Sequence, residues 1–462
     1  MSERNASRAV KLLIEPFQFI SYLQWDSHQT FNDHATLKIT GLISEDKRME
    51  YAEMATREVW VCAKAIDEED EEVILFQGVL THLRVDSVHQ YHTMSIEVKT
   101  GSYLLDQIPH TRTFQQDEMT YQHIIQTCLE SSGGEFIMRE KQAETTKQLT
   151  VQYKESDYSF ILRLAHRLGI VVLPEFKTKG KRLNLGLVQN IPATELMTDD
   201  YAMSRQGLDK DSLVWYERGV YHIKTRDIYE LGQGVRFQRR KLFVSQIESY
   251  LQGSELMHQY TLCELKSAYE RPQPHEKIRG ISMRARITAV ERDLVQVQIH
   301  EDENKDQSGH RWFKFATVYS TPDGTGWFVQ PEKGDETRII FPDSSEKGAY
   351  IASNVHLETS GGRVDPDHKS FKNKHNKEIL LTPERLTLTT NNGLSIELED
   401  SKGITMLSDR NIFIKADGQL HISSENAEVA VYGDRNITLQ QGAAQIEMKD
   451  DIVISGGRID MN

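Results

Sequence analysis

The last part of the chain alternates apolar and polar positions in a short repeat. Each repeat holds two apolar residues separated by one other residue, and the first members run from 379 to 459 in ten steps, a mean of eight residues. The pairs are Ile379/Leu381, Leu386/Leu388, Leu394/Ile396, Ile404/Met406, Ile412/Ile414, Leu420/Ile422, Val429/Val431, Ile437/Leu439, Ile446/Met448, Ile452/Ile454 and Ile459/Met461. A spacing of two places both side chains on one face of a strand. Turn formers such as Asp417-Gly418 separate the pairs, so we expect a ladder of short strands with one apolar face.

This repeat is too short for one turn of a single-chain β-solenoid, which needs about 20 residues. It is long enough for one wall of a prism made by three chains, in which all apolar pairs would face a common axis. We therefore predict an intertwined trimeric β-helix over 379–462, about 50 Å long at roughly 4.8 Å per strand. Its core would include Ile404, Met406, Ile412, Ile414, Leu420, Ile422, Ile437 and Leu439. The alternative is an ordinary antiparallel meander within a sandwich.

The pattern over residues 1–275 predicts a mainly β region with short helices. Strands are expected at 35–40, 59–63, 73–79 and 94–98, and helices at 121–129 and 157–168. Ser156 can cap the second helix and Gly169 can end it. The acidic run 67–72 falls between two strands and is interpreted as a solvated hairpin tip. The segment Arg271-Pro272-Gln273-Pro274 predicts a domain boundary.

Residues 280–358 contain several short apolar strands and predict a small OB-like Greek-key barrel. The strands are expected at 284–290, 294–299, 312–318 and 337–341. Residues 359–378 are polar and basic and are interpreted as a linker to the repeat. The fold class is therefore mainly β: two β-barrels with short helices, an OB-fold barrel and a C-terminal β-helix. Trp25, Trp60, Trp215, Trp312 and Trp327 are expected to fill barrel cores or interfaces.

Composition restricts the class of partner and the place of folding. The 462 residues suffice for three or four domains, and the net charge of −14 argues against nucleic acid as the main partner. Cys62, Cys128 and Cys263 lie far apart, show no metal-ligand spacing and leave one unpaired, which suits a reducing cytoplasm. No apolar run approaches the roughly 20 residues of a membrane span, and no Sec-type signal is visible at the N-terminus. We therefore expect the chain to fold in the cytoplasm; if it leaves the cell, another component must carry it out.

Catalytic signatures are not visible in the sequence. It contains no G-x-S-x-G, H-E-x-x-H or P-loop motif. His82, His89 and His92 form the nearest approach to a cluster, but a metal needs three or four convergent ligands with supporting hydrogen bonds. These histidines are interpreted as solvated or packed, and His300-Glu301-Asp302-Glu303 as an acidic loop. We therefore predict no enzyme activity, no cofactor and no metal.

Two further stretches resemble a known family. The segment Val151–Ala165 followed by Gly169-Ile170 resembles the "QY-x-E-[ST]-D-[FY]-x-F-[IL]-x-R-L…G-I" signature of VgrG proteins, the spikes of type VI secretion and related contractile injection systems. The segment Ala285-Arg286-Ile287, followed by Trp327 and by the later motif residues, resembles the family's OB barrel. The matching motif residues are Gln152, Tyr153, Glu155, Asp157, Phe160, Trp327, Pro331, Gly334, Asp335 and Glu336. Together with the C-terminal repeat, the resemblance covers nearly the whole chain.

The resemblance implies a homotrimer at the tip of a contractile injection apparatus. The N-terminal half would seat on a hexameric inner-tube protein beside baseplate proteins, and the needle would touch a target membrane only during puncture. A PAAR-like tip protein and its effectors would dock on the last strand, Ile459, Asp460, Met461 and Asn462.

The sequence departs from the common family pattern at three places. The loop 302–309 lacks the family's usual "G-R-V-K-V" run, and Thr337 stands where an apolar residue often follows the "GDE" motif. Nothing follows Asn462, so no fused effector domain is expected. The type of injection system stays open. The alternative function is that of a trimeric tail fibre or tailspike with carbohydrate binding or lyase activity.

Overall fold

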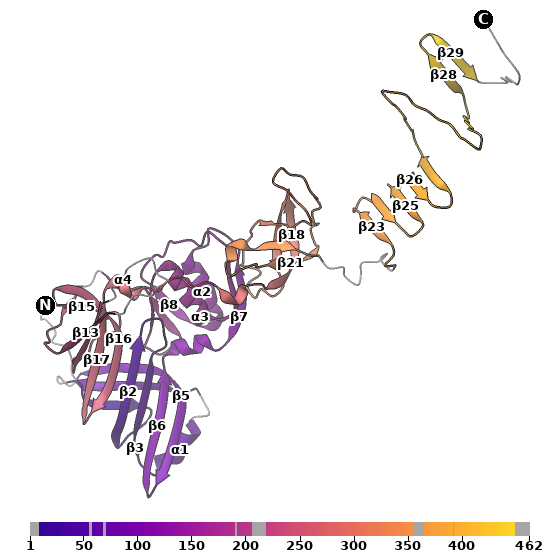
Figure 1. Ribbon diagram of the computed structural model, residues 1–462. Helices are drawn as coiled ribbons and strands as arrows, with labels where there is room; N and C mark the ends of the chain where they lie inside the picture. Colours follow the sequence, from indigo (N-terminus) through magenta and orange to yellow (C-terminus); the bar gives the residue numbers. More distant parts are fainter. Residues whose placement is uncertain are drawn as a thin grey trace. The chain divides into compact units, whose positions relative to one another are not determined.

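The computed structural model describes residues 9–54, 58–67, 71–189, 192–205, 219–354, 365–390 and 392–448. The chain divides into two compact units, Met1–Val355 and His356–Asn462 (Figure 1). Among the described residues, no helix is both long and apolar enough to cross a membrane.

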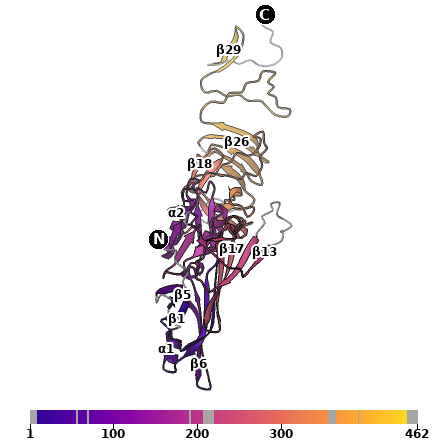
Figure 2. The same ribbon diagram turned by 90° about the vertical axis from the view of Figure 1, so that its left-hand side faces the viewer.

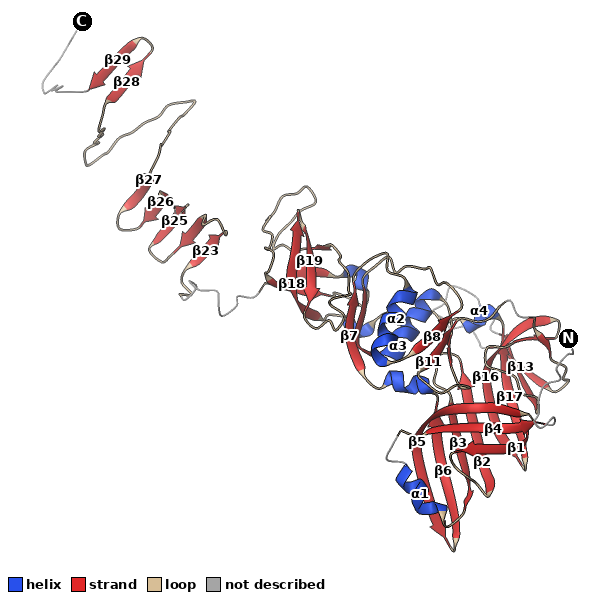
Figure 3. Cartoon of the chain, turned by 180° about the vertical axis from the view of Figure 1, so that it is seen from behind, coloured by secondary structure: helices blue, strands red, loops and turns tan. Residues whose placement is uncertain are grey.

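One large sheet of twelve strands organises the N-terminal region (Figures 1 and 3). Its strands are β1 (Ala9–Glu15), β2 (Ser21–Thr30), β3 (Thr36–Ile43), β4 (Trp60–Asp67), β5 (Glu72–Val88), β6 (Tyr91–Lys99), β12 (Thr194–Glu195), β13 (Tyr201–Arg205), β14 (Gly219–Thr225), β15 (Gly234–Phe237), β16 (Arg240–Gln252) and β17 (Glu255–Cys263). The order is β1-β4-β5-β6-β3-β2-β16-β17-β14-β13, with β15 on β16 and β12 on β15. Helix α1 (Lys47–Met54) lies between β3 and β4 in the chain, and α4 (Leu265–Ala268) follows β17.

The sheet has two halves, each with its own apolar core. Trp25, Leu37 and Phe76 belong to the core of the first half, and Phe237 and Tyr260 to that of the second. The sequence predicted two barrels; the structure has these two apolar cores, and antiparallel pairing of β2 with β16 joins the strands around them in one continuous sheet. The four predicted strands overlap β3, β4, β5 and β6, and two of them begin one residue before the observed strand. In the predicted acidic hairpin tip, β4 ends at Asp67 and β5 begins at Glu72, and residues 68–70 lie outside the described residues.

A helical insertion lies between β6 and β12 in the chain and packs on small strands (Figure 3). It comprises η1 (Gly101–Asp106), β7 (Pro109–Phe114), α2 (Tyr121–Ser132), β8 (Glu135–Met138), β9 (Thr150–Ser156), α3 (Asp157–Leu168), β10 (Val172–Pro174) and β11 (Arg182–Leu185). The predicted second helix is confirmed at both ends. The Ser156 hydroxyl accepts a hydrogen bond from the Ser159 amide at 3.1 Å, and Gly169 ends α3 at φ 63°.

The predicted barrel is a closed five-stranded sheet with order β20-β19-β18-β21-β22. Its elements are η2 (Glu276–Ile278), β18 (Ser282–Glu291), β19 (Leu294–Ile299), β20 (Phe313–Lys314), β21 (Glu336–Ile340), η3 (Glu346–Gly348) and β22 (Tyr350–Ala352). A bridge between Phe315 and Ile351 closes it. Strand β20 is shorter than the predicted 312–318, and the residue after it, Phe315, forms the bridge to Ile351. Leu149 and Val151 of the N-terminal region complete the barrel core.

The second unit is a ladder of antiparallel strands (Figure 2). Its elements are β23 (Lys369–Lys372), β24 (Glu378–Leu381), β25 (Arg385–Thr389), β26 (Leu394–Glu399), β27 (Gly403–Ser408), β28 (Ile437–Gln441) and β29 (Ala444–Met448). The first five form one sheet in chain order, and the last two form a hairpin. Part of the predicted linker is therefore a strand. The Asn373 side chain stabilises the turn between β23 and β24, because its carbonyl oxygen accepts a hydrogen bond from the Lys377 amide at 3.1 Å.

The strands predicted around Ile412, Leu420 and Val429 are absent, since residues 409–436 carry no strand. A strand needs a neighbour that pairs with its backbone groups, and the single chain offers this segment none. The last two predicted apolar pairs lie beyond residue 448, outside the described part of the chain.

Candidate functional sites: the joint and the apolar ladder

The first cluster of motif residues lies at the start of α3. Arg112 of β7 is buried and donates hydrogen bonds to the Asp157 carboxylate at 2.6 Å and to the Gln152 side-chain oxygen at 2.8 Å. The Gln152 nitrogen in turn donates to Asp157 at 3.1 Å. Asp157 also lies in the first turn of the helix, where the helix dipole stabilises its negative charge. Two motif residues therefore lock β7, β9 and α3 together.

Cys128 is part of the same buried layer. Burial raises the pKa of its thiol to about 12, because the charged thiolate is poorly solvated there. The thiol is protonated at neutral pH, and this position is structural rather than nucleophilic.

A second buried cluster joins α3 to the barrel. Arg163 donates to both oxygens of Glu155, at 3.0 and 2.6 Å, and to Glu346 of η3 at 3.0 Å. Arg167 donates to both oxygens of Glu346 at 2.7 Å. The His275 ring lies 3.4 Å from Glu155 and 3.6 Å from Glu346, and both carboxylates are buried. Motif residue Glu155 is thus tied, through Arg163, to a carboxylate almost 200 residues away in the sequence.

The electrostatics of this cluster favour the ionised carboxylates. Burial by itself would raise the pKa of Glu346, but His275 and the charges of Arg167 and Arg163 lower it to about 2. Glu346 is therefore charged at neutral pH, although it is only 3% exposed.

A loop of the barrel forms a second contact between the two parts. Asp302 accepts hydrogen bonds from the Thr113 amide of β7 at 3.0 Å and from the Thr113 hydroxyl. The Glu303 amide donates to the Thr111 carbonyl at 2.9 Å, and the Gln115 amide donates to the Ser308 carbonyl at 2.6 Å. The loop that departs from the family pattern thus extends along β7. We refer to this loop contact and the Glu346 cluster together as the joint.

The aromatic motif residues contribute packing. Phe160 is fully buried and stacks on Phe114, with ring centroids 6.0 Å apart. Tyr153 is partly buried and packs against the barrel core. Trp25 fills a core as predicted, and Trp215 lies outside the described residues. Trp327 is 59% exposed, so within this chain it fills no core.

The motif residues of the barrel form a turn that pairs with β18. The Gly334 amide donates to the Ile287 carbonyl at 2.8 Å, and its φ of 99° suits glycine. Pro331 is buried just before this turn, and the Asp335 carbonyl accepts a hydrogen bond from the Ile287 amide at 2.9 Å. Glu336 accepts hydrogen bonds from Arg286 at 2.8 Å and from His300 at 2.6 Å.

The departure at position 337 has a local explanation. Thr337 is buried, and its hydroxyl donates to the Ala352 carbonyl of β22 at 3.2 Å. A polar residue fits there because its hydroxyl finds a backbone partner.

The apolar pairs of the second unit fall into register on one face. Across neighbouring strands the partners are Ile379↔Leu388, Leu381↔Leu386, Leu388↔Ile396, Leu386↔Leu398, Ile396↔Met406 and Leu398↔Ile404. We refer to these residues as the apolar ladder. In the single chain Ile396 is 37% exposed and Ile404 68% exposed.

The predicted shaft residues beyond the ladder are also uncovered in the single chain. Exposed fractions are 55% for Ile412, 66% for Ile414, 56% for Leu420, 71% for Ile422 and 56% for Leu439. Ile437 is half-buried in β28. The predicted tip-docking residues Ile459, Asp460, Met461 and Asn462 lie outside the described residues.

A metal centre is not found in the described part of the chain, where no three His, Cys, Asp or Glu side chains gather as ligands. His82 lies on β5, opposite Glu97 in the strand register, and His92 lies on β6, opposite Ser87.

Sequence and structure comparisons identify the fold. Residues 30–222 match the family model described as phage tail baseplate hub (GPD). These residues therefore resemble a phage tail baseplate hub domain. The E. coli c3393 protein, described as a type VI secretion component similar to T4 tail proteins gp27 and gp5, superposes with a TM-score of 0.51 at 15% identity, covering 75% of this chain and all of that chain.

A second solved structure has the same fold. The Francisella VgrG, solved in complex with PdpA, matches with a TM-score of 0.58 at 8% identity, covering 84% of this chain and 76% of that chain. The chain therefore has the fold of a VgrG-type hub-and-spike protein, as the sequence motifs predicted. A comparison with curated proteins gave no match.

Sequence reasoning missed the partners of the motif residues. Arg112 holds Asp157 at the start of α3, and Glu346 and Asp302 complete the joint; each of the three lies far from its partner in the sequence. The only local signal was the departure of the 302–309 loop from the family pattern.

Proposed function

We propose that this chain is the homotrimeric spike at the tip of a contractile injection apparatus. Its hub domain would seat on a hexameric inner-tube protein among baseplate proteins, and its C-terminal unit would form the needle that punctures the target envelope. The observation that carries this proposal is the apolar ladder, uncovered in a chain that also resembles a baseplate hub domain.

The ladder supplies enough apolar surface to drive assembly. Its eight members, Ile379, Leu381, Leu386, Leu388, Ile396, Leu398, Ile404 and Met406, form an uninterrupted face. Fully burying such a side chain contributes about 1.5–3 kcal/mol, so half-buried members would contribute about 10 kcal/mol per chain on assembly. Three copies around an axis would cover this face and supply pairing partners for residues 409–436.

The joint suits a part that transmits force. A thrust along the needle must pass from hub to barrel, and the buried Glu155–Arg163–Glu346 cluster and the 302–308 loop connect these parts by hydrogen bonds. Such a connection resists shear better than a surface contact, because each buried charge loses its partner when the parts separate.

The remaining parts of the proposal concern partners, place and chemistry. The Francisella VgrG was solved with a second protein, PdpA, which supports a cargo or tip protein as a partner here, docked at Ile459–Asn462. Assembly would take place in the cytoplasm, with delivery outside on contraction. The role is mechanical, and toxic chemistry would belong to the tip or effector partner.

Co-assembly with the inner-tube protein tests this function. The purified chain, mixed with the hexameric inner-tube protein of its source organism, should form a complex with three spike chains per hexamer, measured by native mass spectrometry. A chain that stays free of the tube protein while remaining folded would contradict the proposal.

A further inference from the structure

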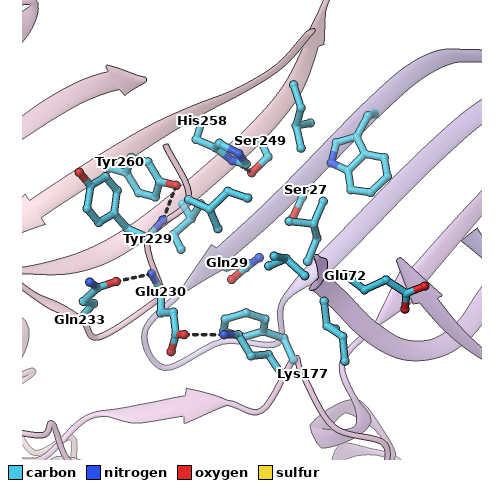
Figure 4. Close-up of a pocket in the computed structure, with 18 of the residues that line it drawn as sticks. Ser27, Gln29, Glu72, Lys177, Tyr229, Glu230, Gln233, Ser249, His258 and Tyr260 are labelled. Atoms are coloured by element: carbon cyan, nitrogen blue, oxygen red, sulfur yellow. Dashed lines mark hydrogen bonds and ion pairs between the residues drawn. The ribbon is translucent and has the colours of Figure 1, made fainter. Parts of the chain in front are cut away.

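A cavity of about 580 Å³ opens between the two halves of the hub sheet (Figure 4). Strands β2, β16 and β17 form its floor with buried residues. The exposed residues Glu72, Thr194 and Glu230 mark its mouth. This volume lies within the range of cavities that hold small molecules.

The floor is polar where an ordinary core would be apolar. In register across the three strands, Ser249 of β16 lies between Ser27 of β2 and His258 of β17. Gln29 occupies the next inward position on β2, and all four residues are buried. Inward positions of a sheet are normally apolar, because buried polar groups must find partners. A polar ligand would supply hydrogen-bond partners for this row of side chains.

Three polar atoms of the floor and wall have no hydrogen-bond partner among the described residues. They are the indole nitrogen of Trp25, the side-chain oxygen of Gln29 and Nε2 of His258. These residues are 1%, 5% and 3% exposed, and all three line the cavity. Nδ1 of His258 is already held by the Ser249 hydroxyl at 2.7 Å, so Nε2 is the nitrogen left for a ligand.

The charges around the cavity favour a neutral ligand. Burial lowers the pKa of His258 to about 4, so its ring is uncharged at neutral pH. At the mouth Lys177 is held by Glu230, and Glu72 is paired with Lys64 at 3.2 Å. An anion would meet three carboxylates there, those of Glu71, Glu72 and Glu230. A cation would reach a floor that offers no carboxylate to neutralise it.

We propose that this cavity binds a small uncharged molecule that carries an amide-type group on an apolar body. The indole N–H of Trp25 can donate to a carbonyl, and the oxygen of Gln29 can accept from an N–H, which an amide supplies together. The apolar body would pack against Leu75, Ile247 and Leu256 in the lining. This site is independent of the proposed mechanical role and would be present in an intact spike.

Three probes of one shape test the proposal on the full-length chain. Benzamide is neutral, benzoate is its anion analogue and benzamidine its cation analogue. The chain is labelled with 5-fluorotryptophan, and the fluorine resonance of Trp25 is assigned with Trp25→Phe. Benzamide should shift this resonance saturably, with a dissociation constant of about 1–10 mM for so small a ligand. Benzoate and benzamidine should leave it unchanged at the same concentrations.

Variants of the floor and of the opposite face separate binding from folding. Gln29→Met should weaken benzamide binding about tenfold, as expected for one lost hydrogen bond. Gln24→Met, at an exposed position of the same strand, should bind like the parent chain. Gln29→Leu, which also lacks the side-chain oxygen, provides a second weakened variant if Gln29→Met does not fold.

The outcomes are distinct. A cavity that holds only ordered water would show no saturable shift with any probe, and this would overturn the proposal. Equal binding of benzoate, or unchanged benzamide affinity in both floor variants, would also overturn it.

Discussion

Replacing Glu346 with glutamine should loosen the barrel from the hub. The change keeps the size of the side chain and removes its charge. It leaves Arg167 without a carboxylate partner and Arg163 with Glu155 only. Because these groups are mostly buried, water can replace the lost partner only in part.

The pKa of Glu346 sets the size of the effect. Lowering the pKa from its ordinary value of 4.5 to about 2 corresponds to about 3 kcal/mol of stabilisation by the surrounding charges. Breaking a buried ion pair from one side costs about 3–5 kcal/mol, which agrees with this value. We therefore expect E346Q to lower the free energy of docking by about 3 kcal/mol at pH 7.

Hydrogen exchange of β7 reports docking directly. The amides of Thr113 and Gln115 donate to the barrel loop, so they exchange only when the barrel moves away. A loss of about 3 kcal/mol should speed their exchange about 100-fold. The matched control is Glu276→Gln, because Glu276 is exposed and pairs only with Arg279, a surface pair worth less than about 1 kcal/mol. Equal exchange in E346Q and E276Q would refute the argument.

The same carboxylate predicts a pH dependence. Because its pKa is lowered in the folded state, its contribution is fully present above 4.5 and is lost as the pH falls towards about 2. The stability difference between the parent chain and E346Q should therefore shrink across this window, as measured by urea unfolding. A constant difference down to pH 2 would show that the carboxylate charge is not the cause.

Three further predictions follow from the structure. Asp302→Ala should leave the buried Thr113 amide and hydroxyl unpaired and cost about 1–3 kcal/mol, measured by urea unfolding. Ile396→Asp should prevent assembly, since a charge on the covered ladder costs several kcal/mol per chain, whereas Ser395→Asp on the other face should be tolerated in sedimentation. Because the pKa of His258 is lowered to about 4, its contribution to stability is full above 6.5 and falls as the pH drops from 6.5 to 4; a His258→Gln chain should lack this part of the pH dependence.

Local signals predicted the helices and strands well. Helix α3 begins and ends where Ser156 and Gly169 placed it, because a cap and a left-handed glycine act within one turn. Strand β19 also matches its predicted bounds of 294–299, since alternation along a strand is visible in the sequence.

Local sequence signals did not predict the contacts between residues that lie far apart in the chain. Nothing near Arg163 indicates that its partner is Glu346, because the contact depends on how the barrel docks. The continuous sheet of the hub likewise depends on pairing between β2 and β16, more than 200 residues apart. The polar floor of the cavity was missed for the same reason, since Ser27, Ser249 and His258 meet only after this pairing forms.

The C-terminal repeat shows what a sequence can predict without its partners. The two-residue spacing gave the apolar face of the ladder, and the strands from Glu378 to Ser408 follow it. The segment 409–436 has the same pattern but no strand, because within the single chain no neighbouring strand pairs with its backbone groups.

The mass of the intact protein in solution tests the central claim most directly. A trimer of 53.2-kDa chains has a mass of about 160 kDa. Light scattering coupled to size-exclusion chromatography should give this value for the full-length chain and about one third of it for Ile396→Asp. A stable, folded full-length chain with the mass of a monomer would contradict the account.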